Sequence, residues 1–501
     1  MSRLVLERLA EPRLQFGLNQ ALEDPRDGLT LFGPLDEGKT FGVRPAVIGT
    51  AAGIQRFWSW VARIQRPIDD GRFSRPPFPG FQAAFGVPFG QKALFEVVLD
   101  NEELIDACRI EDRHQRVHRV VRLYADEIRV ATKDEAQADV WFVVVPDEVY
   151  VSCRPESVVP KDVRRTTGAT LGRGISKRLI AAPGLFEELN VDAIPYKYQP
   201  HFHNQLKALL LDVGVSTQII RESTIAPGDF LNAVGHPRRT VGLPSEIAWN
   251  LCTAAFYKSG ARPWKLSNVR PGVCYLGIVF KRDELSGDGR WSSCGAQMFL
   301  DSGDGLVFKG AGGPWYSETN NSFHLDERAA RRLVATAVSE YRSRVGHPPS
   351  ELFVHGKTRF NAEEWRGFTS GASESTDYVV GVRIRLAEDL RIYRRGRHAV
   401  LRGLAYVRDE RTAFLWANGF IPGLQTYPGR EVPKALLVDV CRGEANIQRV
   451  MEDVLALTKL NYNACIYGDG QPVTLRFANA VGEILTAGPV GGAPTPFKLY
   501  I

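Results

Sequence analysis

The pattern of apolar and polar positions divides the 501-residue chain into two regions of different character. In the first region, helical patterns surround one long apolar run, DVWFVVVPDEVY at 139–150. This run is continuous rather than alternating, which is typical of a buried central strand in a parallel α/β sheet. Amphipathic periodicity predicts helices over 52–68 and 113–138, and turn-forming residues at 24–38 predict turns around a short strand. In the segment 245–266, a further helix is expected to end near Gly260.

Closely spaced apolar runs characterise the second region. Three of them predict a meander of strands, and they are followed by alternating helices and strands. The expected order is strands at 273–281, 294–303 and 305–312, a helix at 327–346, a strand at 351–357, a short helix, and a strand at 378–386. This order is that of an RNase H-like fold. A Pro-Trp link after Gly260 suggests a domain boundary near residue 265.

Composition and charge narrow the class of protein. The chain is 44% hydrophobic and 24% charged, as in globular proteins. Neither a spanning run of about 20 apolar residues nor the apolar core of a signal peptide is visible. Seven dispersed cysteines without a CxxC pair indicate reduced thiols, so we expect a cytoplasmic protein. A net charge of +6 permits nucleic-acid binding without requiring it.

One helix-to-strand turn carries residues suited to an anion. In HFHNQLKALLLDVGVSTQ, residues 201–218, His203 and Lys207 lie four apart and share a helical face. Gly214 marks the expected end of the helix, and Gln218 follows in a β-type run. A lone lysine or histidine on a helix is usually solvated. Together, a cation, an imidazole and an amide at one turn favour a small anion rich in oxygens.

This arrangement resembles the guide-binding MID domain of Argonaute proteins. In that family a Tyr or His, a Lys four residues later, a Gln past the next turn and a Lys on a later helix bind the guide 5′-phosphate. The corresponding residues are His203, Lys207, Gln218 and Lys258, and the segment NLCTAAFYKSG places Asn250 beside the guide end. The resemblance therefore implies a Rossmann-like MID domain.

The second half resembles a PIWI domain, which has an RNase H-like fold. The similarity lies in CYLGIVF, TYPGREVPKALLV, LALTKLNYN and PVTLRFANAVGEIL, and the chain ends in PFKLYI. In many relatives the terminal carboxylate and the guide phosphate hold a divalent ion, so the resemblance implies Mg²⁺ at Ile501. It also implies a short prokaryotic Argonaute, without room for N and PAZ domains. The expected division is an N-terminal segment at 1–138 packing on the rest, MID at 139–265 and PIWI at 266–501.

The positions that carry catalytic carboxylates in active PIWI domains hold other residues here. They correspond to Val279, His355 and Asn479, and two-metal cleavage needs several carboxylates. The resemblance therefore implies an inactive PIWI domain. Glu318 is the nearest candidate for the family's glutamate finger. Four other acidic residues are expected to be solvated: Asp283, Glu284, Asp301 and Asp304.

The resemblance implies guide-directed recognition: a guide, RNA by expectation, pairs with single-stranded target DNA. Such proteins act in defence against invading DNA such as plasmids or phage. They work beside an APAZ-containing effector, sirtuin-like or TIR, that consumes NAD. Two alternatives stay open at this stage. One is a guide-dependent nuclease using shifted carboxylates such as Asp283 and Asp301, and the other is an unguided single-strand binder. The role of the Arg- and Gly-rich loop at 164–174 also stays open.

Overall fold

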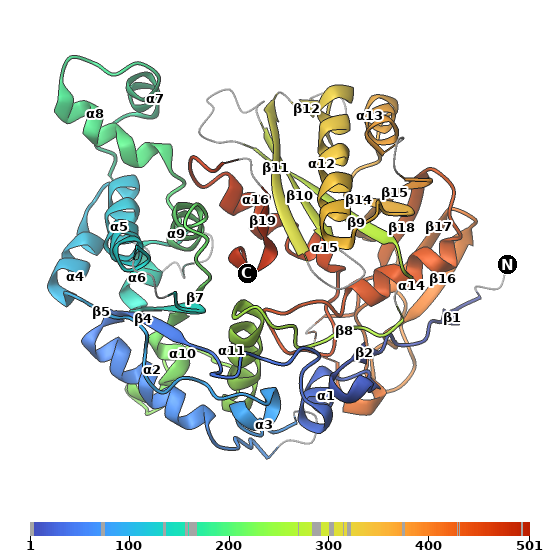
Figure 1. The fold of residues 1–501 in the computed structure, drawn as a ribbon, viewed down its shortest axis with the longest axis horizontal. Coiled ribbons are helices and arrows are strands. Elements are labelled where there is room, and N and C mark those ends of the chain that lie inside the picture. Colours follow the sequence, from blue (N-terminus) through green and yellow to red (C-terminus); the bar gives the residue numbers. More distant parts are fainter. Residues whose placement is uncertain are drawn as a thin grey trace.

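The computed structural model describes residues 5–71, 76–133, 137–155, 159, 168–268, 270–282, 292–299, 305–313, 315–317, 322–372, 376–427, 429, 431–491 and 494–501. Two sheets dominate the chain, and the C-terminus lies between the halves that they organise (Figure 1). The mixed α/β class is confirmed, with a Rossmann-like half and an RNase H-like half. In the described part of the chain no helix has the length and apolarity that crossing a membrane requires.

The first sheet is parallel throughout, with the strand order β5-β4-β6-β7. Its strands are β4 (Pro45–Thr50), β5 (Glu96–Leu99), β6 (Val140–Val145) and β7 (Thr217–Arg221). The fully buried β6 confirms the strand predicted from the continuous apolar run. Two of these strands precede residue 139. The parallel sheet therefore includes strands from residues 1–138, which the sequence analysis treated as a separate N-terminal segment.

Helices cover both faces of this sheet because the strand side chains alternate between the faces. Phe142 and Val144 share one apolar cluster with α2 (Ala51–Ile64) and α11 (Pro244–Lys258). Trp141 and Val143 share another cluster with α4 (Asn101–Arg109), α5 (Arg113–Ala131) and α9 (Phe202–Leu210). The helices on the two faces flank the carboxyl ends of β6 and β7, and parallel α/β sheets usually bind ligands at the carboxyl ends of their strands.

The second sheet has ten strands in the order β1-β16-β17-β18-β15-β14-β9-β10-β11-β19. The meander consists of β9 (Val273–Arg282), β10 (Ser292–Phe299) and β11 (Gly305–Gly313), and β14 (Glu351–Gly356) and β15 (Tyr378–Leu386) continue it in parallel. The RNase H-like order predicted from the sequence is thereby confirmed. The other strands are β16 (Leu404–Asp409), β17 (Thr412–Trp416), β18 (Leu436–Arg442), β1 (Glu7–Arg8) and β19 (Thr495–Pro496).

Helices also cover the second sheet. The helices α12 (Glu327–Val345) and α13 (Ala362–Ala372) pack on the face that includes Leu276 and Val354. The opposite face, which includes Tyr275 and Phe353, packs with α14 (Ile447–Leu457), α15 (Val473–Arg476) and α16 (Ala478–Leu485). Figure 1 shows α16 beside α9 at the junction of the two halves.

Several N-terminal elements differ from the prediction. Residues 24–38 contain the helix α1 (Pro25–Phe32) instead of a short strand. Asp24 caps this helix by accepting from the amide of Arg26, and Pro25 occupies its first turn. The predicted helix over 113–138 is shorter, because α5 ends at Ala131. The N-terminus also crosses to the second sheet, where β1 pairs with β16.

Candidate functional site

The helix α9 presents the predicted anion-binding residues to the C-terminus. His201 caps its first turn by accepting from the amide of Asn204, and Phe202 and Leu206 anchor the opposite face in the core. His203 and Lys207 therefore lie one turn apart on a fixed helix. Asn204 reaches Glu483 of α16 at 3.4 Å, which links this helix to the second half.

Lys207 is buried, with 3% of its surface exposed, and among the described residues its ammonium group donates to three main-chain oxygens, one of which belongs to the last residue, Ile501. The Nζ atom donates to Ile501 at 2.7 Å, to Leu499 at 3.4 Å and to Thr217 at 3.5 Å. Burial lowers the pKa of Lys207 to about 7. Burying an ammonium group costs free energy unless it is hydrogen-bonded or paired, and a bound anion would add a charged partner.

Lys258 comes to the same place from the last turn of α11. Its Nζ atom donates to Gln218 Oε1 at 2.6 Å and to the Thr217 carbonyl at 3.0 Å. Burial, and then the nearby Lys207, hold the pKa of Lys258 well below its ordinary value. Lys207 and Lys258 thus share the Thr217 oxygen at the start of β7. The structure brings Lys207, Gln218, Lys258 and Ile501 together; we call these four residues the lysine cluster.

His203 lies beside the lysine cluster, at the edge of a cavity of about 230 Å³. Burial lowers its pKa, and the charge of Lys207 lowers it further. Tyr150 lines the same cavity. The guanidinium of Arg221 lies 3.7 Å from the centroid of its ring, and the guanidinium of Arg154 lies 5.1 Å from it. The sequence analysis missed these three residues. Their position after the ends of β6 and β7 was the signal that could have indicated them.

Asn250 has a different environment. Its Oδ1 atom accepts from the amide of Cys465 at 2.9 Å, which holds a loop of the second half against α11. Within the described residues, no contact connects Asn250 to the lysine cluster. Its placement beside a guide end stays a prediction.

The residues at Ile501 do not by themselves fit Mg²⁺. Hard oxygen ligands are present, namely Ile501 and the side chain of Gln218, but both already accept from ammonium groups. Two adjacent cations would repel a divalent ion. Among the described residues, no group of three or more His, Cys, Asp or Glu side chains is positioned to hold a metal. Binding of Mg²⁺ therefore stays a prediction that requires phosphate oxygens from a ligand.

Two of the three residues expected at degenerate catalytic positions, Val279 and His355, lie on strands of the RNase H-like sheet, and the third, Asn479, lies on a helix. Val279 is a buried residue of β9. His355 of β14 is 1% exposed, and its Nδ1 atom lies 3.0 Å from Thr474 Oγ1. Burial lowers the pKa of His355 to about 3, so its imidazole is neutral at physiological pH. Asn479 belongs to α16, but its side chain lies outside the described residues. The same is true of five acidic candidates: Asp283, Glu284, Asp301, Asp304 and Glu318.

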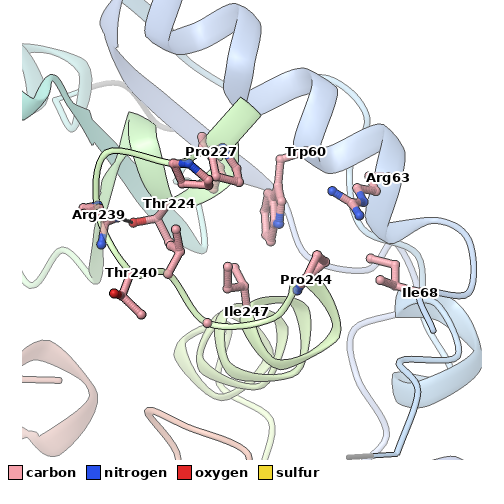
Figure 2. Close-up of a pocket in the computed structure, with 13 residues that line it drawn as sticks. Trp60, Arg63, Ile68, Thr224, Pro227, Arg239, Thr240, Pro244 and Ile247 are labelled. Carbon is pink, nitrogen blue, oxygen red and sulfur yellow. Dashed lines mark hydrogen bonds between the residues drawn. The ribbon is translucent and has the colours of Figure 1, made fainter. Parts of the chain in front are cut away.

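A larger cavity of about 430 Å³ lies between α2, α11 and the loop before α11 (Figure 2). Its wall is mostly apolar, and Figure 2 shows Trp60 and Ile247 facing the open space. Arg239 crosses one end and donates to the hydroxyls of Ser223, at 2.8 Å, and Thr224. Thr224 also lines the cavity beside His203, so the two cavities are neighbours.

Comparison with known proteins identifies the fold. No protein-family model matches the sequence, and no curated protein sequence matches it. Solved structures do match. Clostridium butyricum Argonaute bound to a guide DNA and a 19-mer target DNA is 13% identical, with a TM-score of 0.60 over 99% of this chain and 55% of that chain.

Two other solved structures give the same result. Drosophila Piwi is 12% identical, with a TM-score of 0.58 over 99% of this chain and 56% of that chain. A. aeolicus Argonaute is 14% identical, with a TM-score of 0.54 over 98% and 54%. The chain thus spans about half the length of the structures that it matches. At such low identity the likeness concerns the fold, and the chain has an Argonaute-like fold with the MID–PIWI architecture.

Proposed function

We propose that the protein binds the 5′-phosphate of a short guide strand, RNA in our proposal, and pairs the guide with single-stranded target DNA. The lysine cluster is the observation that carries this proposal. Two buried ammonium groups, from Lys207 and Lys258, converge on the carbonyl oxygen of Thr217, the side-chain oxygen of Gln218 and the oxygen of Ile501. Each would gain a charge-assisted bond by exchanging a neutral acceptor for a phosphate oxygen.

The cavity beside His203 would take the first nucleotide. Its aromatic and guanidinium groups, from His203, Tyr150 and Arg154, can contact a base face and the adjoining backbone. Base pairing would supply sequence specificity, while the protein contacts the backbone and reads shape. The Argonaute from Clostridium butyricum, which has the same fold, was solved with a guide and a target.

Nucleic acid copurified with the protein tests this proposal. We expect short strands of defined length carrying a 5′-phosphate, detected by end-labelling before and after phosphatase treatment. Strands of random length with mixed ends would instead support an unguided single-strand binder. Mg²⁺ is tested separately, because chelation should weaken the preference for a 5′-phosphate only if the guide phosphate and Ile501 hold an ion together.

We further propose that the protein does not cut its target. Val279 has no ligand atom, and His355 is neutral, buried and bonded to Thr474. Neither side chain can replace a carboxylate on a hard cation. In this proposal the protein recognises invading DNA in the cytoplasm, and a partner carries out the response.

That partner is proposed to be an APAZ-containing effector, sirtuin-like or TIR, which consumes NAD once the target is bound. Exposed apolar side chains give such a partner a surface. They gather around α8 (Glu187–Ala193), which projects from the body in Figure 1. They are Leu185, Phe186, Leu189, Val191 and Ile194.

Coexpression with the neighbouring gene tests the partner. We expect a stable heterodimer, and Phe186→Asp, at a side chain that is 71% exposed, should weaken it. A monodisperse lone chain that gives full protection in cells would contradict the need for a partner.

A further inference from the structure

A third cavity, of about 570 Å³, lies on another side of Lys258. Its walls come from the beginnings of β6 and β7, the end of α5 and the end of α11, and include Trp141, Ser216 and Thr132. Lys258 lines it, whereas Lys207 and Gln218 are not among its lining residues. The cavity is therefore distinct from the centre of the lysine cluster, although both share Lys258.

Cations dominate the lining of this cavity. Its charged lining residues are Lys39, Arg44, Arg129, Lys133, Lys258, Lys498 and one carboxylate, Asp139. Asp139 forms ion pairs with Lys39 and, at 3.7 Å, with Arg44. Within the described residues, neither Lys258 nor Lys498 has an ion pair. Arg129 pairs with Asp212, outside the lining, at 2.8 Å, so the excess of positive charge comes from the other cations.

Helix ends explain only part of this excess. A cation at the C-terminal end of a helix is favourable, which accounts for Arg129 on α5 and Lys258 on α11. Lys39 and Arg44 lie outside helices, and Lys498 lies in a single short 3-10 turn, Phe497–Leu499. Burial lowers the pKa of Lys498, and repulsion from Lys39 lowers it further. Gathering these cations costs free energy that a bound anion would recover.

We propose that this cavity binds a compact polyphosphate group carried by a small molecule of the nucleoside triphosphate class. A volume of about 570 Å³ suits a ligand of that size. Several phosphate oxygens match several separate ammonium and guanidinium donors. Phe95 and Trp141 stack with ring centroids 5.8 Å apart and supply an apolar wall beside them. This ligand would be additional to the guide.

Calorimetric titration with sodium tripolyphosphate and with ATP, at constant ionic strength, tests this site. We expect saturable binding of both probes, and much weaker binding of orthophosphate. Lys39→Gln combined with Lys498→Gln should weaken tripolyphosphate by at least roughly tenfold, because two charge-assisted contacts are lost. The matched control is Lys434→Gln, at an exposed lysine of the second half, which should leave the affinity unchanged.

Competition and a guide-site variant separate this site from the others. Lys207→Ala should keep the affinity for tripolyphosphate; if it does not, the probe occupies the guide site and the proposal fails. Displacement of tripolyphosphate by a 5′-hydroxyl oligonucleotide would indicate that the cavity binds the phosphodiester backbone of a nucleic acid instead, and would overturn the proposal. Lack of saturable binding, or equal affinity in the double variant, would also overturn the proposal. Lys39→Gln alone, at a side chain that is 42% exposed, serves if the double variant does not fold.

Discussion

The ammonium group of Lys207 lies 2.7 Å from the main-chain oxygen of Ile501, although 294 positions separate the two residues. Lys207 belongs to α9 of the parallel-sheet half, and Ile501 follows the last strand of the RNase H-like half. This contact therefore joins the two halves at a buried point. Within the described residues no carboxylate side chain pairs with Lys207, so an anionic ligand would have no such side chain to displace.

Removal of that charge gives the first prediction. Lys207→Ala should weaken a 5′-phosphorylated guide by roughly ten- to a hundredfold, the equivalent of one charge-assisted bond of about 1.5–3 kcal/mol. A 5′-hydroxyl guide should be scarcely affected. Filter-binding titrations at two salt concentrations measure both, with Lys434→Ala as the control. Equal weakening of the two guides would make Lys207 an ordinary backbone contact.

Protonation of Lys207 gives the second prediction. Its pKa is lowered to about 7 without ligand, and a bound phosphate dianion should raise it. Binding above pH 7 should therefore take up protons, and affinity should fall with rising pH, by up to roughly tenfold per unit for each lysine that takes up a proton. The guide phosphate is already ionised there, since its second pKa is about 6.

Calorimetry in two buffers with different ionisation enthalpies measures this uptake at pH 8. In Lys207→Ala the uptake should shrink, leaving the share that belongs to Lys258, whose pKa is also lowered. Proton release in the unmodified protein would contradict the prediction.

The fold could largely be predicted from the sequence where apolar patterns were unambiguous. The continuous run in β6 and the meander of β9 and β10 were identified, and their order gave the RNase H-like half. The strands β4 and β5 were missed. β5 is short and has an exposed strand residue, Val98, so its pairing with β4 depends on contacts across the sheet that no local pattern records.

Only those residues of the candidate site whose spacing along the chain makes them neighbours could be predicted from the sequence. Lys207 and Gln218 were predicted to lie close together because they flank the turn between α9 and β7, and helix periodicity indicates which face of α9 carries Lys207. The contact with Ile501 came from the family resemblance, not from a pattern. Tyr150 and Arg154 were missed, because their approach to His203 depends on how the segment after β6 packs beside α9.

The third prediction concerns cleavage. Guide-loaded protein should leave complementary RNA and DNA intact in Mg²⁺ and in Mn²⁺, because Val279 and His355 supply no carboxylate and the buried imidazole is neutral. Gel analysis of end-labelled targets measures this. Guide-directed cleavage that survives repurification and disappears in Asp283→Ala would contradict it and support the shifted-carboxylate alternative.

The fourth prediction concerns packing at the same place. Gly277 of β9 faces the backbone of α15 so closely that an added Cβ would lie 2.3 Å from the Thr474 carbonyl oxygen. Gly277→Ala should therefore push α15 away from the sheet and cost about 1–3 kcal/mol in the free energy of unfolding. It should also disturb the contact between Thr474 and His355.

The control is Gly228→Ala, where nothing lies within 4 Å of the added atom, and it should change stability by less than about 0.5 kcal/mol. Urea titrations compare the midpoints, and hydrogen exchange of the β9 amides shows where protection is lost. A Gly277→Ala protein as stable as Gly228→Ala would contradict the tight packing of α15 against β9.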